Sequence, residues 1–216
     1  MKDGWGWRCA LAKLRVLFTF AILGFGLALG SLAQDQPQDS CTFFPNQDVR
    51  VTNLALPTAP SKDTSAVIAA AVEAVLHEQS LCCGKDSALG DAVLSEPRSL
   101  KELSTKLQGR HLLSDGRPIL VNAEYDPQSA INSGLVIGSL QEQRALLFEW
   151  KSHVYLLYGA IYGEDRCLSG ARHYSIAKLL LLDPRYSDQR REVAFNRETD
   201  DLSKVQGLLS LSVTPQ

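Results

Sequence analysis

The sequence predicts an α+β domain in which N-terminal helices pack on an antiparallel sheet. Two observations support this class. Apolar residues recur at three- and four-residue spacing between residues 64 and 108, and short β-branched or aromatic runs dominate after residue 117. Helical segments that precede a run of strands are typical of α+β folds. The 216-residue chain is long enough for one domain with a sizeable core.

The first 33 residues have the features of a secretory signal peptide. A start with four basic residues precedes an apolar run over residues 16–29. This run is shorter than the roughly 20 residues that a membrane-spanning helix needs. Ser31-Leu32-Ala33 then provides a small-x-small cleavage site. We therefore expect a bacterial protein that is exported, periplasmic or secreted, with no stable membrane insertion after cleavage; an uncleaved signal anchor is the alternative.

The remaining chain divides into two parts. Residues 34–60 are expected to form a linker and an extended N-terminal arm, and residues 61–216 a single domain. Loss of residues 1–33 removes four of the 22 basic and one of the 24 acidic residues, which leaves a net charge of −5. A mildly acidic chain without basic clusters argues against nucleic acid as a partner.

Three helices are expected before the sheet. The first covers residues 64–79, where apolar positions follow helical spacing. A second begins near residue 83 and ends at Pro97. Ser99 and Glu102 form a capping box that starts a third helix, over residues 99–108.

The strands follow. Residues 119–121, 153–158, 176–182 and 208–213 are short apolar, β-branched or aromatic runs bounded by turn residues. The second and third of these runs are expected to pair as neighbouring strands. Residues 140–150 are ambiguous and are compatible with a helix.

Four cysteines remain after removal of the signal peptide: Cys41, Cys82, Cys83 and Cys167. An even number in an exported protein favours disulfides, and four cysteines allow three pairings. One interpretation of Cys82 and Cys83 is therefore a disulfide to Cys41 or Cys167. Zinc is less favoured because the chain has no C-x-x-C or H-x-x-x-H spacing, and no metal or organic cofactor is expected.

A catalytic arrangement is the other interpretation of the cysteine pair. A thiol at a helix N-terminus is stabilised as thiolate by the helix dipole and by free amide groups, which predicts a nucleophile at Cys83. If Tyr162 lies opposite Tyr174 in the expected hairpin, His153 lies opposite Asp183. Directly opposed residues have Cβ atoms about 5 Å apart, within reach of a hydrogen bond. The three side chains would then form a nucleophile, base and orienter.

The order of these motifs resembles a known family. Cys83-Gly84 opens a helix, His153 starts a strand, and a later strand ends at Asp183-Pro184. This pattern is similar to the papain-like cysteine peptidase superfamily, and within it to the bacterial branch that includes the double-glycine leader peptidases. The resemblance covers about residues 65–185 and implies the papain-like fold.

The resemblance also implies roles for individual residues. Cys83 is implied as the nucleophile, His153 as the base and Asp183 as the orienter. Oxyanion stabilisation and substrate binding fall on Gln79, Cys82 and Gly84.

Two functions follow as expectations. The first is an exported cysteine hydrolase that acts on a peptide or protein substrate and forms a thioester acyl-enzyme. The alternative is a non-catalytic exported protein of the same fold, stapled by disulfides, that binds a peptide or a cell-envelope partner. A thiol–disulfide exchange protein is less favoured because C-x-x-C is absent.

Overall fold

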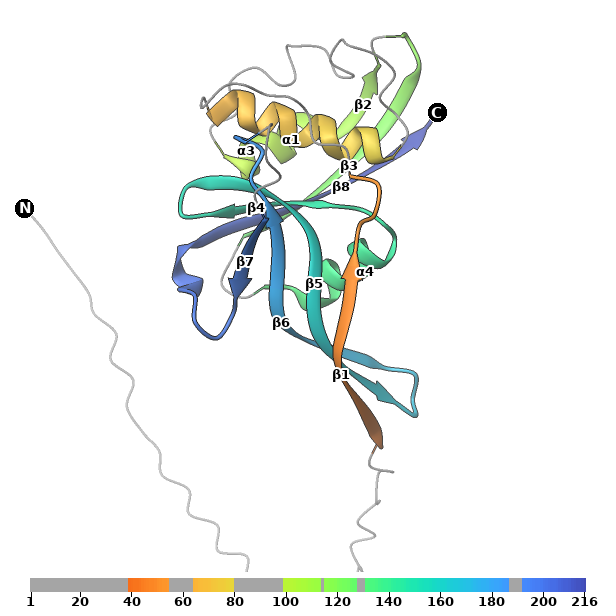
Figure 1. Ribbon diagram of the computed structural model, residues 1–216. Helices are drawn as coiled ribbons and strands as arrows, with labels where there is room; N and C mark the ends of the chain where they lie inside the picture. Colours follow the sequence, from red (N-terminus) through yellow and green to blue (C-terminus); the bar gives the residue numbers. More distant parts are fainter. Residues whose placement is uncertain (1–38, 55–63, 80–98, 114, 128–130, 187–191) are drawn as a thin grey trace, which may run out of the picture. The chain divides into compact units, whose positions relative to one another are not determined.

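The structure is a computed structural model that describes residues 39–54, 64–79, 99–113, 115–127, 131–186 and 192–216 (Figure 1). The expected signal peptide lies outside these residues. So do Cys82, Cys83 and Gly84 and the helix expected after them. The described residues from Asp39 to Gln216 belong to one compact unit.

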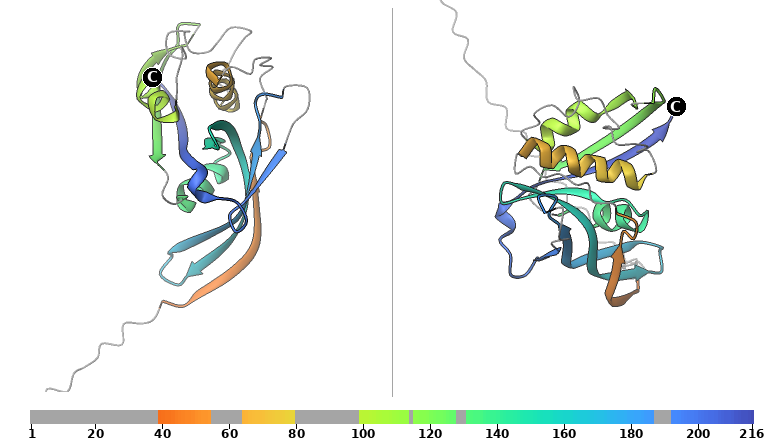
Figure 2. Two further views of the ribbon diagram at one scale, coloured as in Figure 1. Left: turned by 90° about the vertical axis from the view of Figure 1, so that its left-hand side faces the viewer. Right: turned by 45° about the horizontal axis from the view of Figure 1, so that its top comes forward.

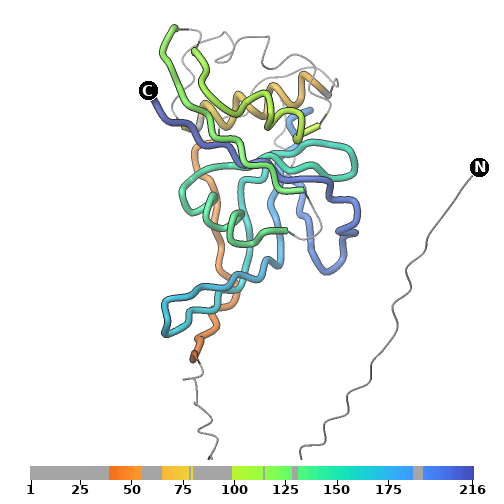
Figure 3. Tube along the Cα trace, turned by 180° about the vertical axis from the view of Figure 1, so that it is seen from behind, coloured from red at the N-terminus to blue at the C-terminus, as the bar shows by residue number. Residues whose placement is uncertain are grey.

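A single antiparallel sheet dominates this unit. The strand order is β2-β3-β8-β4-β5-β6-β7, and β1 pairs with β5 beside that path. Seen from behind, β8 runs along β3 over most of its length (Figure 3). The strand bounds are β1 Cys41–Arg50, β2 Gly109–Leu112, β3 Pro118–Pro127, β4 Leu146–Trp150, β5 His153–Cys167, β6 Arg172–Leu182, β7 Glu192–Asn196 and β8 Val205–Pro215.

Helices make up a smaller part of the described chain. They are α1 Thr64–Glu78, α3 Leu100–Leu107, α4 Ser133–Gln141 and a 3₁₀ turn at Leu202–Lys204. α3 packs against β3 and β8, whereas α1 contacts β5 and β4, and α4 contacts β6, β1 and β5. The ribbon views show β1 beside the β5–β6 hairpin, which extends away from α1 (Figures 1 and 2).

The predicted α+β class, and with it the papain-like fold, is wrong, because the protein has a β-rich fold. Three segments account for the difference. The expected arm contains the ten-residue strand β1, the charged stretch after residue 187 contains β7, and residues 146–150 form β4 instead of a helix. β4 is a continuous apolar run paired on both sides, and periodicity alone cannot distinguish such a strand from a buried helix.

The expectations for two helices are confirmed. α1 buries Ile68, Val72, Val75 and Leu76 on the face that the spacing predicts. The Ser99 hydroxyl accepts a hydrogen bond from the Glu102 amide and caps α3, as its capping box indicates.

Strand β5 changes partners along its length. Residues 153–157 pair with β4 and residues 159–167 pair with β1, while β6 pairs along the opposite edge. The expected pairing of β5 with β6 is confirmed, but its expected register is wrong. Tyr162 lies opposite Ile176 instead of Tyr174, and this offset of two residues is already present at the Arg166–Arg172 pair beside the hairpin loop. Continuing from the Leu156–Leu182 pair places Asp183 opposite Tyr155, two residues away from His153.

Glutamine side chains continue the ladder where strands stop. Gln143 donates to the Arg50 carbonyl and accepts from the Thr52 amide at the open edge of β1. Gln79 does the same with Leu211 and Val213 of β8, beyond the end of β4. A carboxamide can replace a neighbouring peptide group, so these edges are satisfied without another strand.

A disulfide joins Cys41 to Cys167, which are direct partners in the β1–β5 ladder. It ties the start of β1 to the end of β5. A disulfide is consistent with an oxidising compartment. Within the described ranges, no helix is both long and apolar enough to cross a membrane.

Candidate functional site

His153 lies at the surface, at the start of β5. It follows a tight β4–β5 turn in which Lys151 and Ser152 both have positive φ, and its ladder partner is Trp150. An exposed imidazole in this position has room to contact a substrate or a thiol. The structure therefore leaves His153 accessible.

Asp183 is committed to a structural contact. Its residue is 2% exposed, and its carboxylate accepts from the Arg185 Nε at 2.7 Å, from the Arg185 Nη2 at 2.5 Å and from the Arg185 amide at 3.1 Å. These bonds close the turn that follows β6. The carboxylate thus anchors its own turn, and the structure shows no contact between it and His153.

Gln79 lies near the other end of the sheet from His153. Its carboxamide binds Leu211 and Val213, whereas the strand ladder links His153 through Trp150 to Val205. Six to eight residues of β8 correspond to roughly 20–26 Å. The structure does not bring Gln79 and His153 together, and Cys82, Cys83 and Gly84 lie outside the described residues.

The disulfide bears on the two remaining cysteines. Because Cys41 and Cys167 are bonded to each other, neither can pair with Cys82 or Cys83. The expectation of a disulfide from the cysteine pair to Cys41 or Cys167 is therefore wrong.

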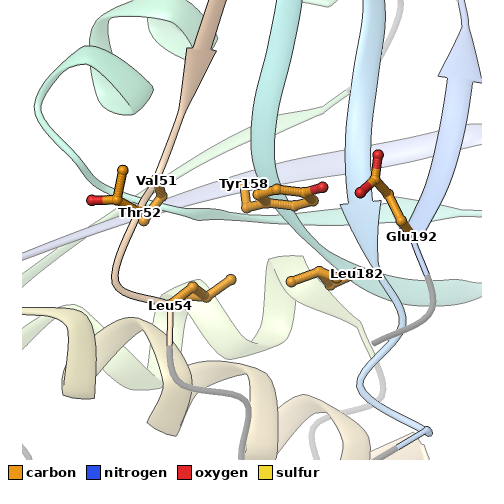
Figure 4. Close-up of a pocket in the computed structure, with 6 residues that line it drawn as sticks. All are labelled: Val51, Thr52, Leu54, Tyr158, Leu182 and Glu192. Atoms are coloured by element: carbon orange, nitrogen blue, oxygen red, sulfur yellow. The ribbon is translucent and has the colours of Figure 1, made fainter. Parts of the chain in front are cut away.

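A pocket lies where the end of β1 approaches β5, β6 and the start of β7 (Figure 4). Its volume is about 120 Å³. Six residues line it: Val51, Thr52, Leu54, Tyr158, Leu182 and Glu192.

The apolar wall of the pocket is fixed by the core. Val51, Leu54 and Leu182 are buried. The Val51 amide donates to the Tyr158 carbonyl at 2.8 Å, and the Thr52 hydroxyl donates to Gln143 at 3.0 Å. Burial and these hydrogen bonds therefore hold the lining residues in place, so the pocket stays open.

Tyr158 occupies a bulge of β5. Leu157 pairs with Leu181 and Gly159 with Leu180, so Tyr158 is the extra residue between them. Bulges redirect side chains and are frequent beside functional sites. In Figure 4 the Tyr158 hydroxyl points toward Glu192, the first residue of β7.

Tyr158 and Glu192 form the polar part of the pocket. The tyrosine hydroxyl faces the Glu192 carboxylate (Figure 4). Burial, and then the interaction with this carboxylate, raise the pKa of Tyr158 far above its usual value. The phenol therefore stays protonated and is a neutral group beside the carboxylate.

One ion pair lies close to this polar part. Arg50 donates three hydrogen bonds of 2.9–3.2 Å to the Asp48 carboxylate, and both residues act electrostatically on Tyr158. The two charges of this pair cancel. Glu192 therefore gives the site a net negative charge.

Sequence reasoning missed this pocket. The sequence places Tyr158 at the end of an expected strand, residues 153–158, and has no motif that marks Glu192. The two residues meet only because β6 lies between β5 and β7 and a bulge reorients Tyr158. No local spacing signals such a meeting.

Among the described residues, Asp39, Cys41 and Cys167 have potential metal-ligand atoms within 4.8 Å of one another. Both sulfurs belong to the disulfide, and Asp39 binds Ser169. This cluster therefore offers no thiolate to a metal.

Comparison with protein-family models, with curated proteins and with solved structures finds no match for this chain. The resemblance to the papain-like superfamily gains no support from these comparisons.

Proposed function

We propose that this protein is an exported, disulfide-stapled binding protein whose pocket at Tyr158 and Glu192 receives a side chain of a peptide or cell-envelope partner. The pocket carries the proposal. It combines a buried apolar wall with one convergent polar pair, which is the usual composition of a recognition site.

The size of the pocket favours one side chain over a whole small molecule. Ligand sites for drug-sized molecules measure about 300–1,000 Å³, and this pocket has about 120 Å³. An occupant of that size is held more firmly when it belongs to a larger partner that also contacts the surrounding surface.

Export rests on the basic, apolar and small-x-small pattern of residues 1–33 together with the Cys41–Cys167 disulfide. N-terminal sequencing of the protein after export tests this part. We expect Gln34 as the first residue, and Met1 would contradict cleavage.

Panning of a random-peptide phage library on the exported protein tests the binding function. Thr52 lines the pocket and is exposed, so Thr52→Trp fills the pocket opening. Thr42→Trp is the matched control, because Thr42 is an exposed residue near the opposite end of β1. We expect enriched peptides that bind wild type and Thr42→Trp but not Thr52→Trp. Absence of enrichment, or equal binding to all three proteins, would overturn the proposal.

A cysteine hydrolase is the second candidate, and two observations favour it. The Cys41–Cys167 bond leaves Cys83 without either of those partners. Continuing the β5–β6 ladder by one pair beyond Leu156–Leu182 places Asp183 opposite Tyr155 and diagonal to His153, a position in which Cα atoms lie about 7–8 Å apart. In this mechanism Cys83 attacks the carbonyl, His153 transfers its proton to the leaving amine, and water releases the thioester. Asp183 must then exchange one Arg185 contact for His153.

Labelling with iodoacetamide near neutral pH tests the hydrolase. An activated thiol at Cys83 predicts fast labelling that Cys83→Ala removes and Cys82→Ala retains. Unchanged labelling in Cys83→Ala would exclude Cys83 as the activated thiol.

A further inference from the structure

Glu192 has unused capacity as an acceptor. An ionised carboxylate offers about four lone-pair sites. Within the described chain, the Tyr158 hydroxyl is the polar group of the pocket that faces it. The neighbouring guanidinium of Arg50 is already bound to Asp48 through three hydrogen bonds. A donor from outside the molecule can therefore bind Glu192 without displacing a partner among the described residues.

The charges around the pocket favour a positively charged ligand group. Asp48 and Arg50 neutralise each other, and Tyr158 is neutral. The carboxylate of Glu192 is the uncompensated charge among these groups. A cation gains a charge-assisted hydrogen bond there, whereas an anion is repelled.

The shape and the lining of the pocket favour a ligand whose charged group is attached to an aliphatic stem. Leu54 and Leu182 present apolar surface below the polar pair and Val51 lies beside it, so a methylene stem fits against them (Figure 4). The face of the Tyr158 ring also attracts a cation. The volume of about 120 Å³ equals that of about four liquid waters, which suits a short chain with a compact head.

We infer that this pocket binds a primary ammonium group on an aliphatic stem, with Glu192 as the charge partner, as in a lysine side chain of the partner polypeptide. This inference rests on the proposed binding function and names its ligand chemistry. An ammonium is compact and directs three donors. The ammonium group can therefore bind the carboxylate while the aliphatic stem packs against Leu54 and Leu182.

The test uses Nα-acetyl-lysine methylamide and its norleucine counterpart, which keeps the apolar stem but lacks the ammonium. Each compound is titrated into the exported full chain, and binding is followed by amide chemical shifts. We expect the lysine compound to shift the amides of Tyr158 and Glu192. We expect the norleucine compound to bind at least about tenfold more weakly, because a hydrogen bond to a charged group is lost.

Glu192→Gln and Glu198→Gln provide the matched variants, since both residues are exposed glutamates of one segment and Glu198 does not line the pocket. We expect Glu192→Gln to weaken the lysine compound by at least about tenfold and Glu198→Gln to leave it unchanged. Equal binding of both compounds, or unchanged affinity in Glu192→Gln, would overturn the inference. Peptides that bind wild type but not Thr52→Trp would still support the binding function in that case.

The source of the ammonium is distinguished by two further probes. n-Butylamine represents a free amine, and an acetylated peptide with one lysine between glycines represents a polypeptide. Tighter binding of the peptide supports a polypeptide partner. Equal binding of the two would show that the pocket takes free amines, which contradicts the polypeptide source.

Discussion

Asp183 and Glu192 are two carboxylates on either side of the β6–β7 connection, and their surroundings differ sharply. Asp183 is 2% exposed and has both oxygens occupied by Arg185. Glu192 is exposed, lines a pocket and faces the Tyr158 hydroxyl. The Asp183 carboxylate is fully used in a structural contact with Arg185, whereas the Glu192 carboxylate can accept a hydrogen bond from a ligand. A conspicuous Asp-Pro pair in the sequence is therefore weaker evidence of a site than an exposed carboxylate that lines a pocket.

The largest expected effect comes from removing the partner of Asp183. Arg185→Met leaves a buried carboxylate unpaired, which costs about 3–5 kcal/mol of unfolding free energy. Glu192→Gln should change the same quantity by less than about 0.5 kcal/mol, because an exposed side chain is replaced. Urea unfolding of both variants measures the contrast. A loss below about 1 kcal/mol in Arg185→Met would erase the distinction between the two carboxylates.

The disulfide should matter to the fold but not to the pocket. Replacing both Cys41 and Cys167 by alanine is expected to cost about 2–4 kcal/mol, since the bond closes a loop with a sequence separation of 126 residues. The pocket lies at the other end of β1, so binding at Glu192 should persist in the folded double variant. Loss of binding in a double variant that is still folded would show that the disulfide at one end of β1 affects the pocket at the other end, contrary to this expectation.

Gln143 should connect stability to the pocket wall. Gln143→Ala removes the side chain that bridges Arg50 and Thr52, with an expected cost of about 1 kcal/mol. The amide of Thr52 should then exchange with solvent faster. Gln141→Ala is a control on the same segment, because Gln141 contacts Tyr162 instead of β1. Equal exchange of Thr52 in wild type and Gln143→Ala would show that the bridge is not formed.

Glu149 is intermediate in burial between the buried Asp183 and the exposed Glu192. Burial raises its pKa above the usual value, and a hydrogen bond from the Leu100 amide opposes this only in part. A raised pKa means that the folded state prefers the protonated acid, so this contribution is full at low pH and is lost as the pH rises through the folded-state pKa.

Glu149→Gln removes that loss, because the amide cannot ionise. Relative to wild type, the variant should therefore gain stability between about pH 4 and pH 7, by no more than about 1 kcal/mol. Unfolding free energies of the two proteins across this range measure the effect. A variant that becomes relatively less stable as the pH rises would contradict the raised pKa.

The sequence predicts those elements whose signal is local. The apolar spacing of α1 and the Ser99 cap of α3 are confirmed, as is the pairing of β5 with β6. β7 could not be predicted, because its charged sequence becomes a strand only through pairing with β6. The pocket could not be predicted either, since the position of Tyr158 depends on a bulge in β5 that no residue pattern in the sequence indicates.

Intermolecular NOEs show whether the pocket beside Glu192 is a binding site. With the lysine compound bound, we expect NOEs from its methylene protons to the methyl groups of Leu54 and Leu182. NOEs confined to residues outside the pocket, or binding without any contact to these leucines, would contradict a binding site in this pocket.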